Sequence, residues 1–133
     1  MSNNTASRRP RVVLAEDDAL LRYTIKLIVE KDCEVVGEAD NGGAAVELAE
    51  QLRPDVVLLD NSMPVLTGIE AARLIREKLP DVRVIIVSNY TDTAHIEEAF
   101  QSGAHGYVVK DTASFRLPKA IEEALNGKVV RPA

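Results

Sequence analysis

Four consecutive apolar residues lead into a carboxylate at Val56-Val57-Leu58-Leu59-Asp60. The run is too short for a helix, contains two β-branched residues and is flanked by acids, so it predicts a buried strand. Similar short runs occur at residues 12–15, 82–87 and 106–109, with a weaker one at 35–39. We therefore expect five buried strands.

Helical spacing separates these strands. Residues Ala45, Leu48, Ala49 and Leu52 recur at i, i+3, i+4 and i+7, and Pro54 ends that pattern. Residues 117–125 repeat the spacing before Gly127, and shorter stripes lie at 21–28, 68–78 and 94–102. Five alternating strand–helix units predict an α/β domain with a parallel sheet covered by helices on both faces.

The bulk composition is that of one globular domain. The chain has 133 residues, of which 46% are hydrophobic and 28% charged, with a net charge of -5. This charge disfavours non-specific binding to nucleic acid or anionic membranes, and no apolar run approaches the roughly 20 residues that span a bilayer. Residues 1–10 are polar and predict a disordered tail rather than a secretory signal. Cys33 is the single cysteine, so we expect a cytoplasmic protein.

Polar residues collect where the predicted strands end. They are Glu16-Asp17-Asp18, Asp60, Ser88-Asn89 and Lys110-Asp111. In a parallel sheet these positions meet at one edge, where such folds bind ligands. Two carboxylates 4 Å apart repel by about 4 kcal/mol at an effective dielectric of 20, and a divalent cation such as Mg²⁺ offsets this cost.

The same cluster predicts phosphoryl chemistry. A carboxylate can act as the nucleophile toward a phosphoryl group, and Asp60 is the best candidate because it ends the most continuous buried strand. Lys110 would supply a cation and Ser88 a hydroxyl donor.

The pattern as a whole resembles a known family. Glu16-Asp17, Asp60 followed by Met63-Pro64 and Gly68, Ser88, Tyr107 and Lys110 are similar to the receiver domain of two-component response regulators. The resemblance implies a flavodoxin-like (βα)5 fold with strand order 2-1-3-4-5. It also implies that Asp60 accepts the phosphoryl group. The other implied roles are Mg²⁺ binding by Glu16, Asp17, Asp60 and the backbone carbonyl of Ser62, phosphoryl binding by Ser88 and Lys110, and an aromatic switch at Tyr107.

Further details resemble one subgroup, the receivers of LuxR-type transcription regulators. They are Lys110-Asp111, Ser88-Asn89 and the ending Ala124-Leu125-Asn126-Gly127-Lys128. Two positions depart from the common pattern: Glu16 stands where the family most often has Asp, and Asp111 where many members have Pro. We expect a receiver domain at 11–127, with 128–133 as a tail or the start of a linker. The chain is then either a stand-alone receiver or a longer regulator cut at its linker.

The resemblance also implies partners and a response. The phosphoryl donor would be a sensor histidine kinase or a phosphotransfer protein. Phosphorylation would shift a surface made by the fourth helix, fifth strand and fifth helix. A homodimer is a further expected partner. DNA would be contacted only through a C-terminal helix-turn-helix domain absent from this chain, and no membrane contact is expected.

Other functions fit less well. A magnesium-dependent phosphatase with an Asp nucleophile needs a general acid two positions later, where this chain has Ser62. Residues 37–43 lack the Lys-Ser/Thr of a P-loop. A flavodoxin-like cofactor binder would share the architecture, which alone does not assign function. We expect no enzyme beyond its own phosphoryl transfer and slow self-dephosphorylation.

Overall fold

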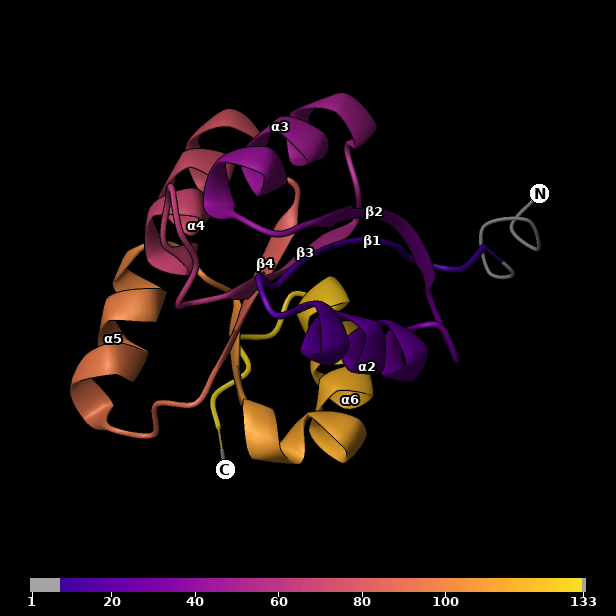
Figure 1. Ribbon diagram of the computed structural model, residues 1–133. Coiled ribbons are helices and arrows are strands. Elements are labelled where there is room, and N and C mark those ends of the chain that lie inside the picture. The colour runs from indigo at the N-terminus through magenta and orange to yellow at the C-terminus, as the bar shows by residue number, and fades with distance from the viewer. Residues whose placement is uncertain (1–7, 133) are drawn as a thin grey trace.

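A computed structural model describes residues 8–132 as a five-stranded parallel sheet between two layers of helices (Figure 1). The sheet order is β2-β1-β3-β4-β5, which confirms the expected fold class and strand order. The strands are β1 (Arg11–Ala15), β2 (Glu34–Ala39), β3 (Val56–Asp60), β4 (Arg83–Ser88) and β5 (Gly106–Val109).

The helices lie close to the positions that the periodicity predicted. They are α2 (Ala19–Val29), α3 (Gly42–Leu52), α4 (Gly68–Lys78), α5 (Thr93–Gln101) and α6 (Ala113–Leu125), with a short 3₁₀ helix η1 (Lys110–Thr112). Side-chain caps begin several of them. Asp18 accepts a hydrogen bond from the Leu21 N–H at 3.0 Å, as a capping acid before α2 should. Thr67 and Glu70 form a reciprocal capping box at α4.

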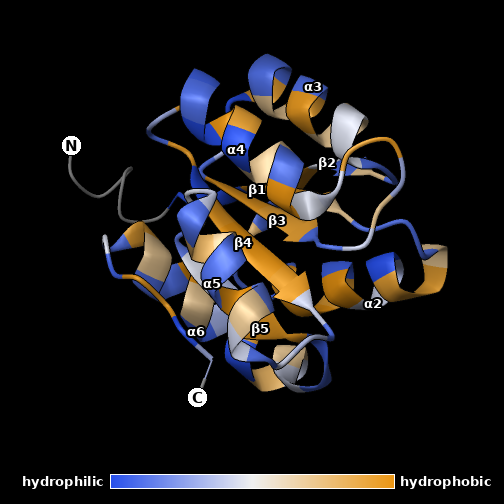
Figure 2. Ribbon diagram, turned by 90° about the vertical axis from the view of Figure 1, so that its left-hand side faces the viewer, coloured by the Kyte–Doolittle hydropathy of each residue, from blue (hydrophilic) through white to orange (hydrophobic). Residues whose placement is uncertain are grey.

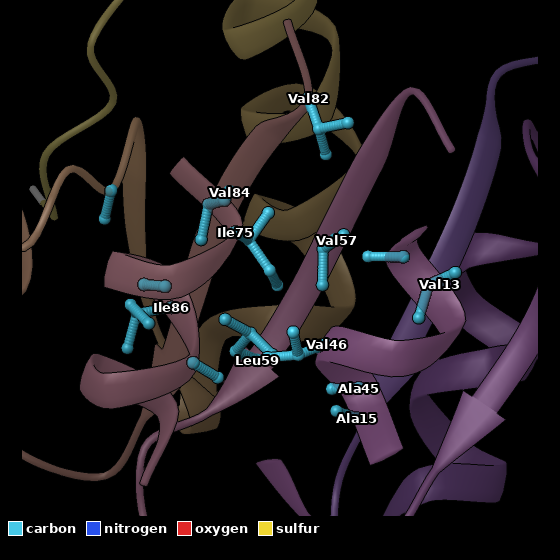
Figure 3. Close-up of a cluster of buried hydrophobic side chains, with 14 of the residues drawn as sticks. Val13, Ala15, Ala45, Val46, Val57, Leu59, Ile75, Val82, Val84 and Ile86 are labelled. Carbon is cyan, nitrogen blue, oxygen red and sulfur yellow. The ribbon is translucent and has the colours of Figure 1, made fainter. Parts of the chain in front are cut away.

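Two hydrophobic cores hold the layers together. In the core drawn in Figure 3, alternate residues of the strands pack against α3, α4 and α5; the other core packs the opposite sheet face against α2 and α6. Figure 2 shows the strands as apolar bands between helices that are polar on their outer sides. All five residues of β3 are buried because this strand lies in the centre of the sheet.

The prediction of five buried strands is wrong for β2. It lies at the sheet edge, where Glu34 and Glu38 are exposed and, among its residues, only Ala39 is buried. A register shift between Val12 and Val13 of β1 further interrupts this pairing. An edge strand needs fewer apolar residues, which explains the weaker signal at 35–39.

The chain outside 11–127 is partly in contact with the sheet. Residues 1–7, most of the predicted disordered tail, lie outside the described residues, whereas Arg8 forms an ion pair with Asp55 at 3.3 Å. After α6, residues 128–132 run back along β5. Within 8–132, no helix combines the length and the apolar character needed to cross a bilayer.

Candidate functional site

Three acids from two neighbouring strands converge at the carboxyl edge of the sheet. Glu16 and Asp17 follow β1, and Asp60 ends β3, which pairs with β1 so that Ala15 lies opposite Leu59. One oxygen from each carboxylate lies within 4.8 Å of the others. Glu16 and Asp60 are only 1% and 4% exposed, while Asp17 is exposed. The three acids that the sequence predicted to converge therefore do lie together, with two of them buried and Asp17 exposed.

Lys110 contacts two of these acids from the start of η1. Its Nζ lies 2.8 Å from Asp60 Oδ1 and 3.1 Å from Glu16 Oε1. The second oxygen of Glu16 accepts a hydrogen bond from the Asp18 N–H at 3.1 Å. Glu16 Oε1, however, is buried and has no hydrogen bond from any described residue, so its contact with Lys110 is an ion pair only.

The site shifts the proton affinities of its own groups. Burial raises the pKa of Glu16, and the charge of Asp60 raises it further. Burial also raises the pKa of Asp60, against the opposing effect of Lys110. Burial lowers the pKa of Lys110, but its contacts with Asp60 and then Glu16 outweigh this and raise the pKa overall. One ammonium thus does not fully compensate the buried negative charge.

A divalent cation fits this arrangement on two counts. Glu16 Oε1 is a buried oxygen without a hydrogen bond among the described residues, and a metal ion would satisfy it. The donor set consists of carboxylate oxygens with one side open to water, which suits Mg²⁺. Ser62 is exposed in the loop after β3, and its backbone carbonyl as a fourth ligand stays a prediction.

The loop after Asp60 is tightly built. An added Cβ at Gly68 would lie 2.4 Å from the Asp60 backbone oxygen, so this close approach requires glycine. Val65 has a φ of 71° and is 79% exposed, and the Leu66 N–H donates to Pro64 O at 2.9 Å across it. A β-branched residue in this region is strained. A strained residue thus lies five positions after the candidate nucleophile.

Ser88 and Tyr107 lie on neighbouring strands beside the acids. Ser88 ends β4, is 2% exposed, and its Oγ accepts a hydrogen bond from the Tyr90 N–H at 3.1 Å. Tyr107 in β5 is 1% exposed, and its hydroxyl donates to Tyr90 O at 2.8 Å. Burial raises the pKa of the Tyr107 phenol. Both side chains are therefore fixed to one residue of the loop that leads into α5; their switching roles stay predictions.

Sequence reasoning missed how that loop is held. The Tyr90 and His95 rings stack at 3.8 Å with 4° between their planes, and His95 Nδ1 lies 2.7 Å from Asp92 Oδ1. This contact lowers the pKa of Asp92, which also caps α5. The Asp-x-x-His spacing at the start of a helix could have predicted the contact between Asp92 and His95. No pattern in the sequence predicts the stacking of Tyr90 on His95.

Comparison with known proteins agrees with this geometry. A family model for the response regulator receiver domain matches residues 12–122. The chain is 37% identical over 122 residues to the transcriptional regulatory protein YdfI of Bacillus subtilis, covering 90% of this chain and 57% of YdfI. It is also 37% identical over 121 residues to the nitrate/nitrite response regulator protein NarL of Escherichia coli, covering 90% of this chain and 56% of NarL.

A solved structure shows the same relationship. The two-component response regulator of the LuxR family from Aurantimonas superposes with a TM-score of 0.88 at 33% identity, covering 92% of this chain and 89% of that one. The chain spans somewhat more than half the length of the two curated relatives that it matches.

Proposed function

Because this chain belongs to the response-regulator receiver domain family, we propose that its phospho-acceptor is Asp60 and that Glu16, Asp17 and Asp60 hold Mg²⁺ during the transfer. The observation that carries the proposal is the convergence of the three acids within 4.8 Å together with the contact of Lys110 with two of them. Receiver domains are signalling domains rather than enzymes of turnover. The family match at 12–122 supports domain limits of 11–127.

The proposed transfer uses groups already in contact. A carboxylate oxygen of Asp60 attacks phosphorus and forms an acyl phosphate, while the bond to the donor's leaving atom breaks and that atom keeps the electron pair. Lys110, 2.8 Å from the carboxylate, would hold a phosphoryl oxygen, with the Ser88 hydroxyl as a second donor. Bound Mg²⁺ would neutralise part of the phosphoryl charge, with the carbonyl of Ser62 completing its protein ligands.

The alternative function, a magnesium-dependent phosphatase, lacks its general acid near Asp60. Position 62 is serine, so no carboxylic acid stands two residues after Asp60 to protonate a leaving group. The acyl phosphate would then be a stored signal that hydrolyses slowly. The proposed response is a shift of the face made by α5, β5 and α6, in which Ser88 leaves Tyr90 for the phosphoryl group and Tyr107 changes rotamer.

Proposed partners follow from the family and from one surface feature. A histidine kinase or phosphotransfer protein would donate the phosphoryl group in the cytoplasm. Leu20, Tyr23 and Leu27 form an apolar stripe on α2, exposed by 77%, 57% and 49%, directly after the acids of β1. A docking protein would bury such a stripe. We further propose that the domain controls transcription through a separate DNA-binding domain, with or without homodimerisation.

Mass spectrometry tests the acceptor. Incubation with acetyl phosphate and Mg²⁺ should add one phosphoryl group to the wild type and none to Asp60→Asn. Asp111→Asn is the matched control, because it removes an exposed acid adjacent to Lys110 and should label like the wild type. Equal labelling of Asp60→Asn would disprove the assignment. Sustained hydrolysis of a phosphate monoester by the wild type would favour the phosphatase instead.

A further inference from the structure

The last described residues add a strand-like segment to the sheet. Val130 forms a parallel bridge with Gly106 of β5. The Tyr107 N–H donates to Val130 O at 2.9 Å, and the Val130 N–H donates to His105 O at 2.8 Å. Val130 is 6% exposed and packs in the core shared with α2 and α6. We call residues 128–132 the strap; it covers the outer edge of β5, which would otherwise leave these backbone groups unpaired.

Arg131 fastens the strap to the helices on both sides. Its Nη1 lies 2.8 Å from Glu97 Oε2, and its guanidinium carbon lies 4.4 Å from the centroid of the Phe100 ring, both on α5. Its backbone oxygen accepts a hydrogen bond from Arg116 Nη2 of α6 at 3.2 Å. In Figure 1 the yellow end of the chain accordingly emerges between α5 and α6. One residue thus joins two helices across β5.

The strap also meets the residue that links β5 to the loop before α5. Its two backbone hydrogen bonds lie on either side of Gly106, and one of them comes from the N–H of Tyr107, whose hydroxyl reaches Tyr90 O in that loop. A displacement of α5 away from β5 must therefore stretch the Arg131 contacts, and a displacement of β5 must break the strap's hydrogen bonds. The ion pair is half exposed, at 53% and 46% for its side chains, so it is a weak attachment that can open.

We propose that the strap is a releasable clamp that holds α5 against β5 and α6, and that Arg131 is its positioning residue. While it is closed, the edge of β5 and the adjoining side of α5 are unavailable to a partner. Opening of the clamp on phosphorylation is the part of this inference that rests on the proposed function. The role of Arg131 in the unmodified protein does not depend on it.

Amide hydrogen exchange of single residues tests the clamp in the unmodified chain. Arg131→Ala should make the Tyr107 and Val130 amides exchange about five- to tenfold faster, because the cation–π and ion-pair contacts that keep the strap closed are lost. Lys128→Ala is the matched control: it removes a strap cation that pairs with no acid within 8–132, and should leave both amides as in the wild type. Unchanged exchange in Arg131→Ala would overturn the proposal.

Two further measurements complete the test. If Arg131→Ala does not fold, Glu97→Gln removes the ion pair from the α5 side and should accelerate exchange of the Tyr107 and Val130 amides. Unchanged exchange of these amides in Glu97→Gln would refute the clamp. After acetyl phosphate treatment, protein verified by mass as phosphorylated should show the acceleration in the wild type and no further change in Arg131→Ala. Phosphorylated wild type with unchanged amides would refute release of the clamp but leave Asp60 as acceptor. Absence of any phosphoryl mass would instead refute the proposed function.

Discussion

Asp60→Asn should stabilise the protein when no divalent cation is present. The side chain is 3% exposed, and its carboxylate lies within 4.8 Å of two other acids and 2.8 Å from Lys110. At an effective dielectric of 20, the two repulsions are about 3.5 kcal/mol each and the attraction is about 6 kcal/mol. These Coulomb contributions nearly cancel, so the cost of burying the charge decides the sign, in agreement with the raised pKa of Asp60.

We expect a gain of about 1–3 kcal/mol in the free energy of unfolding at pH 7, or roughly 3–10 °C in Tm. The assay is urea unfolding in EDTA, followed by circular dichroism, with Asp81→Asn as a control because Asp81 is an exposed acid far along the sheet from the site. Added Mg²⁺ should stabilise the wild type as a bound ligand does and Asp60→Asn much less.

The pH dependence gives a second check on the same variant. The folded-state pKa of Asp60 lies above its usual value of 3.8, so the folded protein retains a proton that the unfolded chain releases. Wild-type stability from this group therefore falls as pH rises from that value through the folded-state pKa. The advantage of Asp60→Asn should be small near the usual value and grow with pH. A variant less stable than the wild type at pH 7 in EDTA, or an advantage that grows on acidification, would refute the reasoning.

Three other substitutions test the loop after Asp60 and, at His105, the opposite edge of the sheet. Burial, with nearby arginines, lowers the pKa of His105 to about 4, so the stability of the wild type should fall as the pH drops from 6.5 toward 4. In urea unfolding, His105→Asn should reduce this loss by about 2 kcal/mol. The same dependence of stability on pH in both proteins would contradict this expectation. Val65→Gly should stabilise the protein by about 1 kcal/mol, because the relief of backbone strain exceeds the conformational entropy that glycine loses on folding. A lower urea midpoint for the variant than for the wild type would contradict this. Gly68→Ala should destabilise by at least about 2 kcal/mol and slow phosphorylation, because its Cβ meets the Asp60 backbone at 2.4 Å. Gly43→Ala is its control, because Gly43 also lies in the first turn of a helix without a positive φ, but its added Cβ would meet no atom nearer than 3.2 Å; an equal loss in both would refute the steric explanation.

Much of the fold followed from local patterns because burial and periodicity are linked. β3 was the clearest strand in the sequence since its position at the centre of the sheet demands apolar residues throughout. β2 was misjudged since an edge strand can expose Glu34 and Glu38. The convergence of Glu16, Asp17 and Asp60 could be predicted because parallel strands bring their carboxyl ends to one edge.

Other features depended on contacts between distant residues, which no local pattern encodes. The sequence offered Lys110 as a cation, but only the packed structure shows it against Asp60 and Glu16, with one Glu16 oxygen left without a hydrogen bond. Likewise, 128–132 reads as a tail until the fold brings Arg131 between α5 and α6. The sequence by itself determined which residues are buried in the central strands and which acids meet, because these follow from repeating backbone geometry. The tertiary structure decided how charges are paired and which segments close the surface, because those depend on side chains that meet only after the chain has folded.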